Sequence, residues 1–257
     1  MSPPPVWLDD RFIDAAKGSV PIRSLTVTQG VGAYETLRLV HGHAPWIERH
    51  VERLRKACDA MQLPGAERDW ASITSELSRR CALPDARVRI TIGDGFALVT
   101  CDPLPPELER ERNAGVRLRS NRMLRPDPQL KSVSRWPLVE LERKAGGEVL
   151  LTNSSGHPLE TTRANLFVGS GDRLLTAPET LVLPGIARAI VLEIATEQGI
   201  PVLEALPPAD FASRGFEVFL TNAIRGVRPV VRIDDHALSI GSLSRRIQEA
   251  LDLKLGM

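Results

Sequence analysis

One segment of the chain has the residue types of a phosphate-binding turn. In Leu183–Arg188 a Pro-Gly pair breaks the preceding structure, and apolar residues at helical spacing follow directly until Gly199 ends them. Such a turn leaves unpaired N–H groups at the positive end of a helix dipole, where a phosphate binds favourably. Because most Pro-Gly turns before helices are only turns, this interpretation depends on other groups in the chain. Those groups are Lys131, Glu160, Arg53 and the tripeptide Thr221-Asn222-Ala223.

Lys131 and Glu160 could supply an amine and a carboxylate to an electron-withdrawing ring. Lys131 is one of five lysines in a chain that carries most of its positive charge on arginine. An exposed lysine beside a linker needs no function, whereas a desolvated, neutral amine could form a Schiff base. Glu160 is either a solvated carboxylate at a strand edge or a buried one that accepts a hydrogen bond from a protonated ring nitrogen. The buried carboxylate would keep that ring cationic, which makes it an electron sink.

Arg53 and Thr221-Asn222-Ala223 each have a structural and a phosphate-binding interpretation. Arg53 lies one residue from the apolar stripe of a predicted helix, so its stem could cover the core or its guanidinium could bind phosphate. The tripeptide closes a predicted strand, where its N–H and hydroxyl groups could form an ordinary turn or bind the same phosphate. The residue types alone leave both interpretations open.

The hydrophobic periodicity predicts an α+β fold with a β-rich C-terminal half. The first half contains two strands at 26–40 around a glycine bend, a helix at 47–61, a helix that begins near Trp70, paired strands at 87–92 and 96–101, and a surface loop at 103–113. The second half contains helices at 136–144, 186–198 and 243–251 and strands at 148–153, 164–168, 173–176, 202–206, 217–220 and 229–233. Prolines and charge at 123–128 mark a boundary, so the expected parts are a domain of residues 1–122, a linker of 123–130 and a domain of 131–257.

The composition is that of an ordinary soluble globular chain, with 42% hydrophobic and 25% charged residues. A formal net charge of +1 gives no electrostatic reason to expect nucleic acid or an anionic membrane as a partner. No apolar run is long enough to span a bilayer, and residues 1–5 do not resemble a signal peptide. Three cysteines without a CxxC pair indicate a reducing compartment, so we expect a cytoplasmic protein. The isolated histidines predict no metal site.

The order of these segments along the chain resembles that of the fold-type IV pyridoxal-phosphate enzymes, the class IV aminotransferase family. The matching segments are Gly32–Arg38, His50–Leu54, Leu130–Ser132, Glu160–Phe167, Leu183–Arg188 and Phe219–Val230. The resemblance implies a small N-terminal α/β domain, a larger β-rich C-terminal domain built as a pseudo-barrel, and a homodimer. It implies pyridoxal 5'-phosphate as the cofactor of a small-molecule enzyme, with Lys131 bonded to the cofactor and Glu160 at its ring nitrogen. The residues that it implies around the phosphate are Arg53, Ile186, Ala187, Asn222 and Ala223.

Two of the segments, Glu160–Leu166 and Thr221–Val230, are most similar to the 4-amino-4-deoxychorismate lyases of this family. These enzymes convert 4-amino-4-deoxychorismate into pyruvate and 4-aminobenzoate, a folate precursor. The resemblance then implies that Lys131, displaced by the substrate amine, removes the proton from the carbon that bears the nitrogen. Thr36 is a candidate for a hydroxyl that assists the leaving enolpyruvyl group, and Tyr34 occupies the family's position for an aromatic residue that faces cofactor and substrate.

Three departures from the family pattern affect the details. Ala187 stands where the phosphate turn usually has a hydroxyl residue, and Ser134 stands where the lyases have an asparagine. The strand that contains Arg89 ends without the arginine of many relatives, so Arg38 or Arg89 would have to bind the substrate carboxylate. The same residues are compatible with an aminotransferase that acts on branched-chain or D-amino acids with a 2-oxo acid acceptor, and with a cofactor-binding protein that lacks turnover.

Overall fold

The computed structural model describes residues 4–257, so part of the N-terminal segment inspected for a signal peptide lies outside the described residues. The described chain forms two compact units. The first contains the residues up to Pro105 together with Leu130–Arg135, and the second contains Pro106–Gln129 and Trp136–Met257. These limits differ from the expected boundaries, because residues 116–122 pair with strands of the second unit and residues 130–135 hydrogen-bond to a strand of the first.

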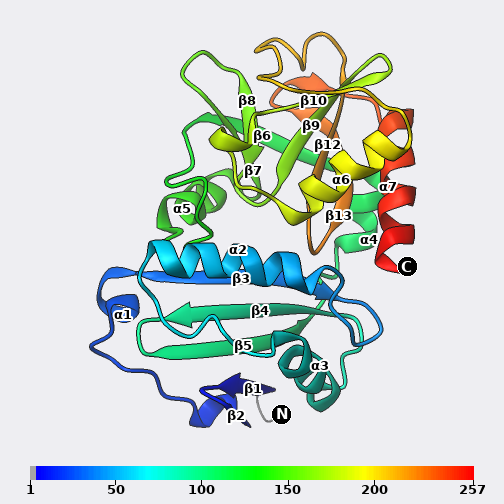
Figure 1. Cartoon of the computed structure of the whole chain (residues 1–257). Coiled ribbons are helices and arrows are strands. Elements are labelled where there is room, and N and C mark those ends of the chain that lie inside the picture. The colour runs from blue at the N-terminus through cyan, green and yellow to red at the C-terminus, as the bar shows by residue number, and fades with distance from the viewer. Residues whose placement is uncertain (1–3) are drawn as a thin grey trace. The chain divides into compact units, whose positions relative to one another are not determined.

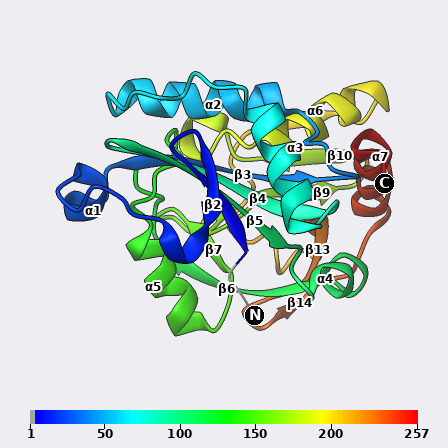
Figure 2. The ribbon, with the colours of Figure 1, turned by 90° about the horizontal axis from the view of Figure 1, so that it is seen from below.

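The first unit is built on one antiparallel sheet. Its strands are β1 (Pro5–Leu8), β2 (Arg11–Asp14), β3 (Gly32–Leu39), β4 (Ala86–Gly93) and β5 (Phe96–Pro103). They lie in the order β2-β1-β5-β4-β3. Helix α2 (Ile47–Ala60) contacts the sheet along β3, and α3 (Trp70–Cys81) contacts β1 and β5 (Figure 1, Figure 2). The unit also contains the short helices η1 (Ala15–Lys17) and α1 (Leu25–Gln29).

Successive side chains of β3 and β4 point to opposite faces of this sheet. Leu37 on β3 and Val88 and Ile90 on β4 are fully buried in the core with residues of the two longer helices. Burying each such side chain contributes about 1.5–3 kcal/mol relative to exposure. The alternate residues of the same strands, which include Tyr34 and Arg89, lie on the other face. The packing of the core therefore decides which side chains the sheet presents on its second face.

The second unit is built on a sheet that closes on itself. Its strands are β6 (Val116–Arg122), β7 (Val149–Thr152), β8 (Pro158–Thr161), β9 (Asn165–Ser170), β10 (Arg173–Thr176), β11 (Val202–Glu204), β12 (Glu217–Asn222), β13 (Gly226–Ile233) and β14 (His236–Ala237). They follow the order β11-β10-β9-β12-β13-β6-β7-β8, with β14 beside β13. Because β8 pairs again with β9, the strands from β9 to β8 complete a ring. The predicted β-rich pseudo-barrel is confirmed.

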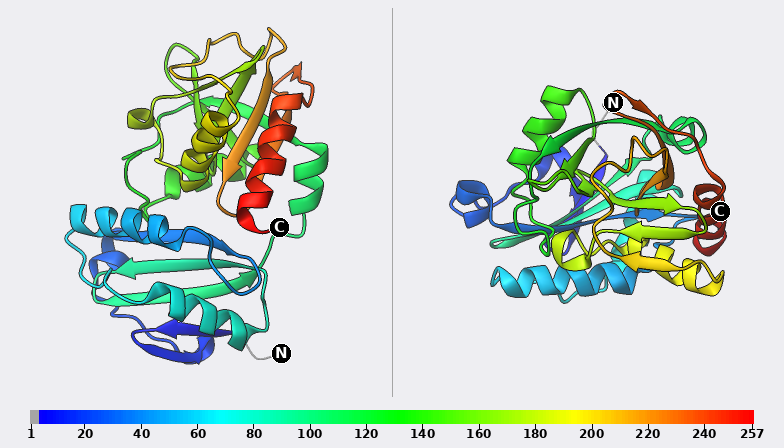
Figure 3. Two further views of the ribbon diagram at one scale, coloured as in Figure 1. Left: turned by 45° about the vertical axis from the view of Figure 1, so that its right-hand side comes forward. Right: turned by 90° about the horizontal axis from the view of Figure 1, so that it is seen from above.

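Helices cover this barrel-like sheet. They are α4 (Leu108–Ala114), α5 (Trp136–Ala145), α6 (Ile186–Glu197), α7 (Ser242–Leu255) and the short η2 (Glu179–Leu181). Helices α4 and α7 both contact β13, and α6 contacts α7 and β12 (Figure 3). Among residues 4–257, no helix is both long and apolar enough to cross a membrane.

Helix α1 replaces part of the first strand expected at 26–40. The Ser24 hydroxyl accepts a hydrogen bond from the Val27 N–H at 3.3 Å, which caps the helix at its N-terminus. Gly30 ends the helix with φ +71°, a conformation that favours glycine. The glycine bend of the prediction is therefore a helix cap, and only the strand that follows it forms.

Helix α4 and strand β8 of the second unit also differ from the prediction. Part of the loop expected at 103–113 forms α4, because Leu108 and Arg112 are buried there. Strand β8, which contains Glu160, is missing from the prediction. It has only four residues, which is too short for a recognisable alternation of apolar and polar positions. It also begins at Pro158, and proline is unfavourable within strands.

Candidate active site

Lys131 is connected to β3 by backbone hydrogen bonds. The Tyr34 N–H donates to the Lys131 carbonyl at 2.9 Å, and the Val133 N–H donates to the Gly32 carbonyl at 2.9 Å. The Lys131 Nζ atom lies 5.1 Å from the centroid of the Tyr34 ring. The guanidinium carbon of Arg89 lies 3.7 Å from the same centroid, so two basic groups lie within cation–π range of one ring. This part of the structure brings together Lys131, Tyr34 and Arg89.

Thr36 and Arg38 share the face of β3 that carries Tyr34. Thr36 is half-buried and lies opposite Arg89 in the register of β3 and β4, and Arg38 is 8% exposed and lies opposite Arg87. Directly opposite residues of an antiparallel pair project from the same face, so these side chains belong to one polar surface. Burial lowers the pKa of Arg89. The surface is rich in guanidinium groups, as a binding site for carboxylates would be.

Arg53 is held by a buried carboxylate. Its Nε and Nη2 atoms donate to the two Glu35 oxygens at 2.7 and 2.8 Å, and His50 Nδ1 lies 2.8 Å from one of them. Burial alone raises the pKa of Glu35, but Arg53 and His50 outweigh burial and hold this pKa well below its usual range. Burial lowers the pKa of His50, so its imidazole is neutral at pH 7 and Nδ1–H donates to Glu35. Two of the five N–H bonds of Arg53 therefore fix the plane of its guanidinium.

Glu35 and His50 are absent from the sequence-based set of site residues. The sequence carries two signals for them. His50 and Arg53 are three residues apart on one helix, which places them on the same side. Glu35 is a carboxylate in a strand whose neighbouring positions are largely apolar. A buried strand carboxylate needs a partner, and the next helix of the chain offers one.

Glu160 lies where the ring of the second unit closes, opposite Asn165 on β9. It is 2% exposed, so it is not a solvated carboxylate at a strand edge. Its Oε1 atom accepts from Arg125 Nε at 2.5 Å and from the Leu183 N–H at 3.3 Å. Asn165 Nδ2 donates to the Leu183 carbonyl at 2.9 Å. Glu160 and Asn165 thus bind the N–H and the carbonyl of Leu183, the residue that precedes the Pro-Gly pair. Arg125, which lies in the predicted linker, places a positive charge beside the carboxylate.

The Pro-Gly turn ends at the N-terminus of α6, as predicted. Gly185 is the N-cap, and no side chain within the described part of the protein caps the first turn, which contains Ile186 and Ala187. A Cβ atom at Gly185 would lie 2.0 Å from Asn165 Oδ1, so this close packing requires glycine. Since the first N–H groups of a helix have no intrahelical partner, α6 offers donors to an anion at this end.

Asn222 and Ala223 lie in the turn between β12 and β13. Asn222 Oδ1 accepts from the N–H groups of Ile224 at 3.1 Å and Arg225 at 2.8 Å. Its Nδ2 atom donates to the Arg163 carbonyl at 3.3 Å. The Asn222 side chain therefore orders the turn from within, through the N–H groups of the two residues that follow Ala223.

These groups fit pyridoxal 5'-phosphate, the cofactor that the resemblance implies. A primary amine suits its aldehyde, a buried carboxylate suits its ring nitrogen, and a helix N-terminus suits its phosphate. The hydroxyl of Thr221, next to the Asn222 turn, is buried and has no hydrogen-bond partner within residues 4–257. A buried hydroxyl without a partner is unfavourable, and a phosphate oxygen would satisfy it. The predicted cofactor residues are Lys131 and Arg53 in the first unit, and Glu160, Ile186, Ala187, Asn222 and Ala223 in the second.

Proteins that are similar to this chain have names that refer to different reactions. The putative branched-chain-amino-acid aminotransferase of Methanocaldococcus jannaschii is 24% identical over 271 residues, which cover 95% of this chain and 94% of that protein. The aminodeoxychorismate lyase of Bacillus subtilis is 27% identical over 262 residues, which cover 87% of this chain and 84% of that protein. A hypothetical aminotransferase from Mycobacterium tuberculosis in its PLP-bound form has the same fold, with a TM-score of 0.87, 20% identity and 98% of each chain covered.

The model of one enzyme family, described as amino-transferase class IV, matches residues 32–233. This range begins with β3 and ends with β13, so it contains all of the predicted site residues. The family depends on pyridoxal 5'-phosphate, which agrees with the donors described above. The chain therefore belongs to the class IV aminotransferase family of pyridoxal-phosphate enzymes.

Proposed function

We propose that this enzyme is a lyase that converts 4-amino-4-deoxychorismate into 4-aminobenzoate and pyruvate. The observation that carries the proposal is the guanidinium-rich face of β3 and β4, where Arg38 and Arg89 lie on the same side as Tyr34, beside Lys131. The substrate has one carboxylate on its ring and a second on its enolpyruvyl group, and each suits an arginine. A branched-chain amino acid has a single carboxylate and an aliphatic side chain, for which an apolar surface is more favourable.

We assign the cofactor contacts from the family resemblance and from the chemistry of the side chains. Lys131 binds the cofactor covalently, and Glu160 accepts a hydrogen bond from its ring nitrogen. Arg125 beside Glu160 favours the ionised carboxylate that this hydrogen bond requires. When bound, the cofactor supplies an electron sink for the carbon next to the substrate amine. The residues that hold its phosphate are Arg53, Ile186, Ala187, Asn222 and Ala223.

The proposed reaction removes one proton and breaks one carbon–oxygen bond. Lys131 Nζ accepts the proton from the ring carbon that bears the amino group. The bond between the neighbouring ring carbon and the enolpyruvyl oxygen then breaks, and the oxygen keeps the electron pair. The departing enolpyruvate takes up a proton at its methylene carbon and becomes pyruvate, while the ring becomes aromatic without net oxidation or reduction. We propose that the Thr36 hydroxyl hydrogen-bonds to the leaving oxygen and that the Tyr34 ring packs against the substrate.

An aminotransferase that acts on branched-chain or D-amino acids is the second candidate. Similarity to the Methanocaldococcus protein, which extends over almost the whole chain, favours it. It would share the proton removal by Lys131, but it would require a 2-oxo acid to accept the amino group. The two candidates therefore differ in whether turnover depends on a second substrate.

Substitution of Arg89 tests the observation that carries the proposal. Arg89→Gln should lower kcat/KM for 4-amino-4-deoxychorismate roughly 10- to 100-fold, since a charge-assisted bond to a carboxylate is lost. Arg87→Gln is the matched control, because Arg87 is on the same strand but pairs with Asp102 at 3.2 Å. A value of kcat/KM for Arg89→Gln that equals that of the control would contradict the proposed role.

We also propose that the enzyme is a cytoplasmic homodimer. The thiols of Cys58, Cys81 and Cys101 are free, which suits a reducing compartment. The homodimer follows from the family resemblance, and light scattering of the purified protein tests it. A mass of 28.2 kDa in solution, that of one chain, would contradict it.

A further inference from the structure

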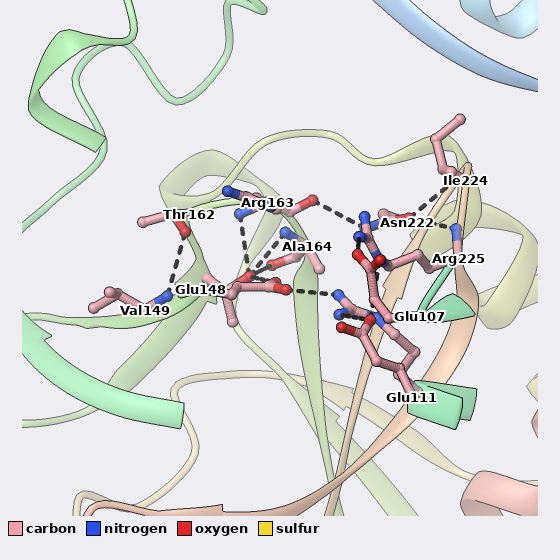
Figure 4. Close-up of polar contacts among 12 residues, drawn as sticks. Glu107, Glu111, Glu148, Val149, Thr162, Arg163, Ala164, Asn222, Ile224 and Arg225 are labelled. Carbon is pink, nitrogen blue, oxygen red and sulfur yellow. Dashed lines mark hydrogen bonds and ion pairs between the residues drawn. The ribbon is translucent and has the colours of Figure 1, made fainter. Parts of the chain in front are cut away.

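Arg225 and Arg228, just after the Asn222 turn, belong to a partly buried ion-pair network (Figure 4). Arg225 donates from Nε to a Glu111 oxygen at 3.0 Å and from Nη2 to Glu107 at 2.5 Å. Arg228 donates from Nη1 to the same Glu111 oxygen at 3.0 Å and from Nη2 to Glu148 at 2.8 Å. The Arg228 side chain is 2% exposed, so its pairs are largely desolvated, whereas Arg225 is 13% exposed and its partner Glu107 is 34% exposed.

The network holds the backbone of the turn as well as its side chains. The Arg225 N–H donates to Asn222 Oδ1, and the Arg225 carbonyl accepts from Arg112 Nη1 at 3.1 Å. Gly226 follows with φ +61°, and a Cβ atom there would lie 2.6 Å from Arg112 Nη1. Residue 225 is therefore fixed by Asn222 within the turn, by Arg112 at its carbonyl and by two glutamates at its side chain.

The same network extends to the turn that follows Glu160. Glu148, the partner of Arg228, accepts a hydrogen bond from the Thr161 hydroxyl. The Thr161 hydroxyl oxygen accepts from the Ala164 N–H at 2.8 Å, which closes the turn between β8 and β9. Figure 4 shows Glu148 beside Arg163 and Ala164 of one turn, and Glu107 and Glu111 beside Asn222 and Arg225 of the other. The segment with the buried carboxylate and the segment with the Ala223 amide are thus parts of one hydrogen-bonded assembly.

We propose that Arg225, through Glu107 and Glu111, is a positioning residue that keeps the turn at 222–226 in its phosphate-binding conformation. The inference rests on the proposed assignment of this turn to the cofactor phosphate, and it holds equally for a lyase and for an aminotransferase. A turn that is ordered before binding loses less conformational freedom when it binds an anion. Arg225 should therefore affect the affinity for ligands that carry the phosphate and not for ligands that lack it.

Pyridoxal 5'-phosphate and pyridoxal, which lacks the phosphate, distinguish a positioning role from a merely structural one. Arg225→Gln removes both ion pairs of this residue in the full-length apoenzyme. We expect the Kd for pyridoxal 5'-phosphate to rise roughly 2- to 30-fold, and the Kd for pyridoxal to stay within about twofold, both by fluorescence titration. Arg225→Lys should recover part of the loss, since lysine keeps the charge but lacks the planar fork that reaches two carboxylates.

Two further variants make the test decisive. Glu107→Gln removes the network carboxylate that is 34% exposed and leaves Arg225 paired with Glu111. This variant should fold, and it should lower the affinity for pyridoxal 5'-phosphate but not the affinity for pyridoxal. Glu197→Gln removes an ion pair with Lys254 elsewhere in the same unit and should change neither constant. Equal loss of affinity for both ligands in Arg225→Gln or Glu107→Gln would overturn the proposal, as would unchanged affinity for both. Neither result depends on lyase turnover, so it is separable from a failure of the proposed reaction.

Discussion

Replacing Glu35 by glutamine should destabilise the first unit strongly. Glu35 is fully buried and accepts three hydrogen bonds, two from Arg53 and one from His50. Removing one partner of a buried ion pair costs about 3–5 kcal/mol, because the other charge stays buried without compensation. Glutamine keeps one oxygen that still accepts a hydrogen bond from Arg53, so we expect a loss of about 3 kcal/mol, the lower end of that range.

Tryptophan fluorescence during urea unfolding measures this loss. Trp7, Trp46 and Trp70 all lie in the first unit, so the emission reports mainly on it. With a slope of about 2 kcal/mol/M, a loss of about 3 kcal/mol lowers the urea midpoint by about 1.5 M. Glu67→Gln is the control, because that carboxylate pairs with an arginine at the surface and is 74% exposed. If Glu35→Gln unfolds at the midpoint of the control, the carboxylate does not hold Arg53 in the way described.

Three other predictions concern single residues, namely Gly185, His50 and Thr221. Gly185→Ala should destabilise the protein by about 1–3 kcal/mol, because the added Cβ atom would lie 2.0 Å from Asn165 Oδ1. Gly147→Ala is the control, since the space around Gly147 is open. Thermal unfolding compares the two variants, and equal melting temperatures would refute the predicted steric clash. Burial lowers the pKa of His50, so the unfolded chain takes up this proton first, and the free energy of unfolding should fall as the pH drops below about 6.5. His50→Gln should flatten that dependence in urea titrations between pH 7 and 5.5, and an unchanged slope would assign it to other groups. Thr221→Val should leave the free energy of unfolding unchanged or raise it, because the Thr221 hydroxyl has no hydrogen-bond partner within residues 4–257. The same substitution should raise the Kd for pyridoxal 5'-phosphate, and an unchanged Kd would exclude this hydroxyl from the phosphate site.

The parts of the site that could be predicted depend on local signals. The Pro-Gly turn and the helical spacing after it predict α6 and its free N-terminus from one short stretch of chain. Alternation along residues 87–92 predicts β4 and therefore which side Arg89 occupies. The order of the motifs along the chain predicts the family, its cofactor and the pseudo-barrel, and all three are confirmed.

The parts that could not be predicted depend on partners distant in the chain. Arg53 reaches Glu35 on a preceding strand, Arg125 reaches Glu160 across 35 residues, and Arg225 reaches Glu107 across 118 residues. A residue type and its position can signal that a side chain needs a partner, as for Glu35, but the identity of the partner depends on which strands and helices become neighbours. The unpredicted β8 has the same origin, since its pairing with β7 and β9 rather than its composition makes it a strand.

Turnover of 4-amino-4-deoxychorismate by the cofactor-loaded enzyme, in the absence of any 2-oxo acid, tests the central claim most directly. The proposed lyase should release 4-aminobenzoate and pyruvate in a one-to-one ratio over many turnovers, and Lys131→Ala should abolish both products. If the enzyme releases neither product but transfers amino groups from an amino acid once 2-oxoglutarate or pyruvate is added, it is an aminotransferase and the lyase proposal is wrong.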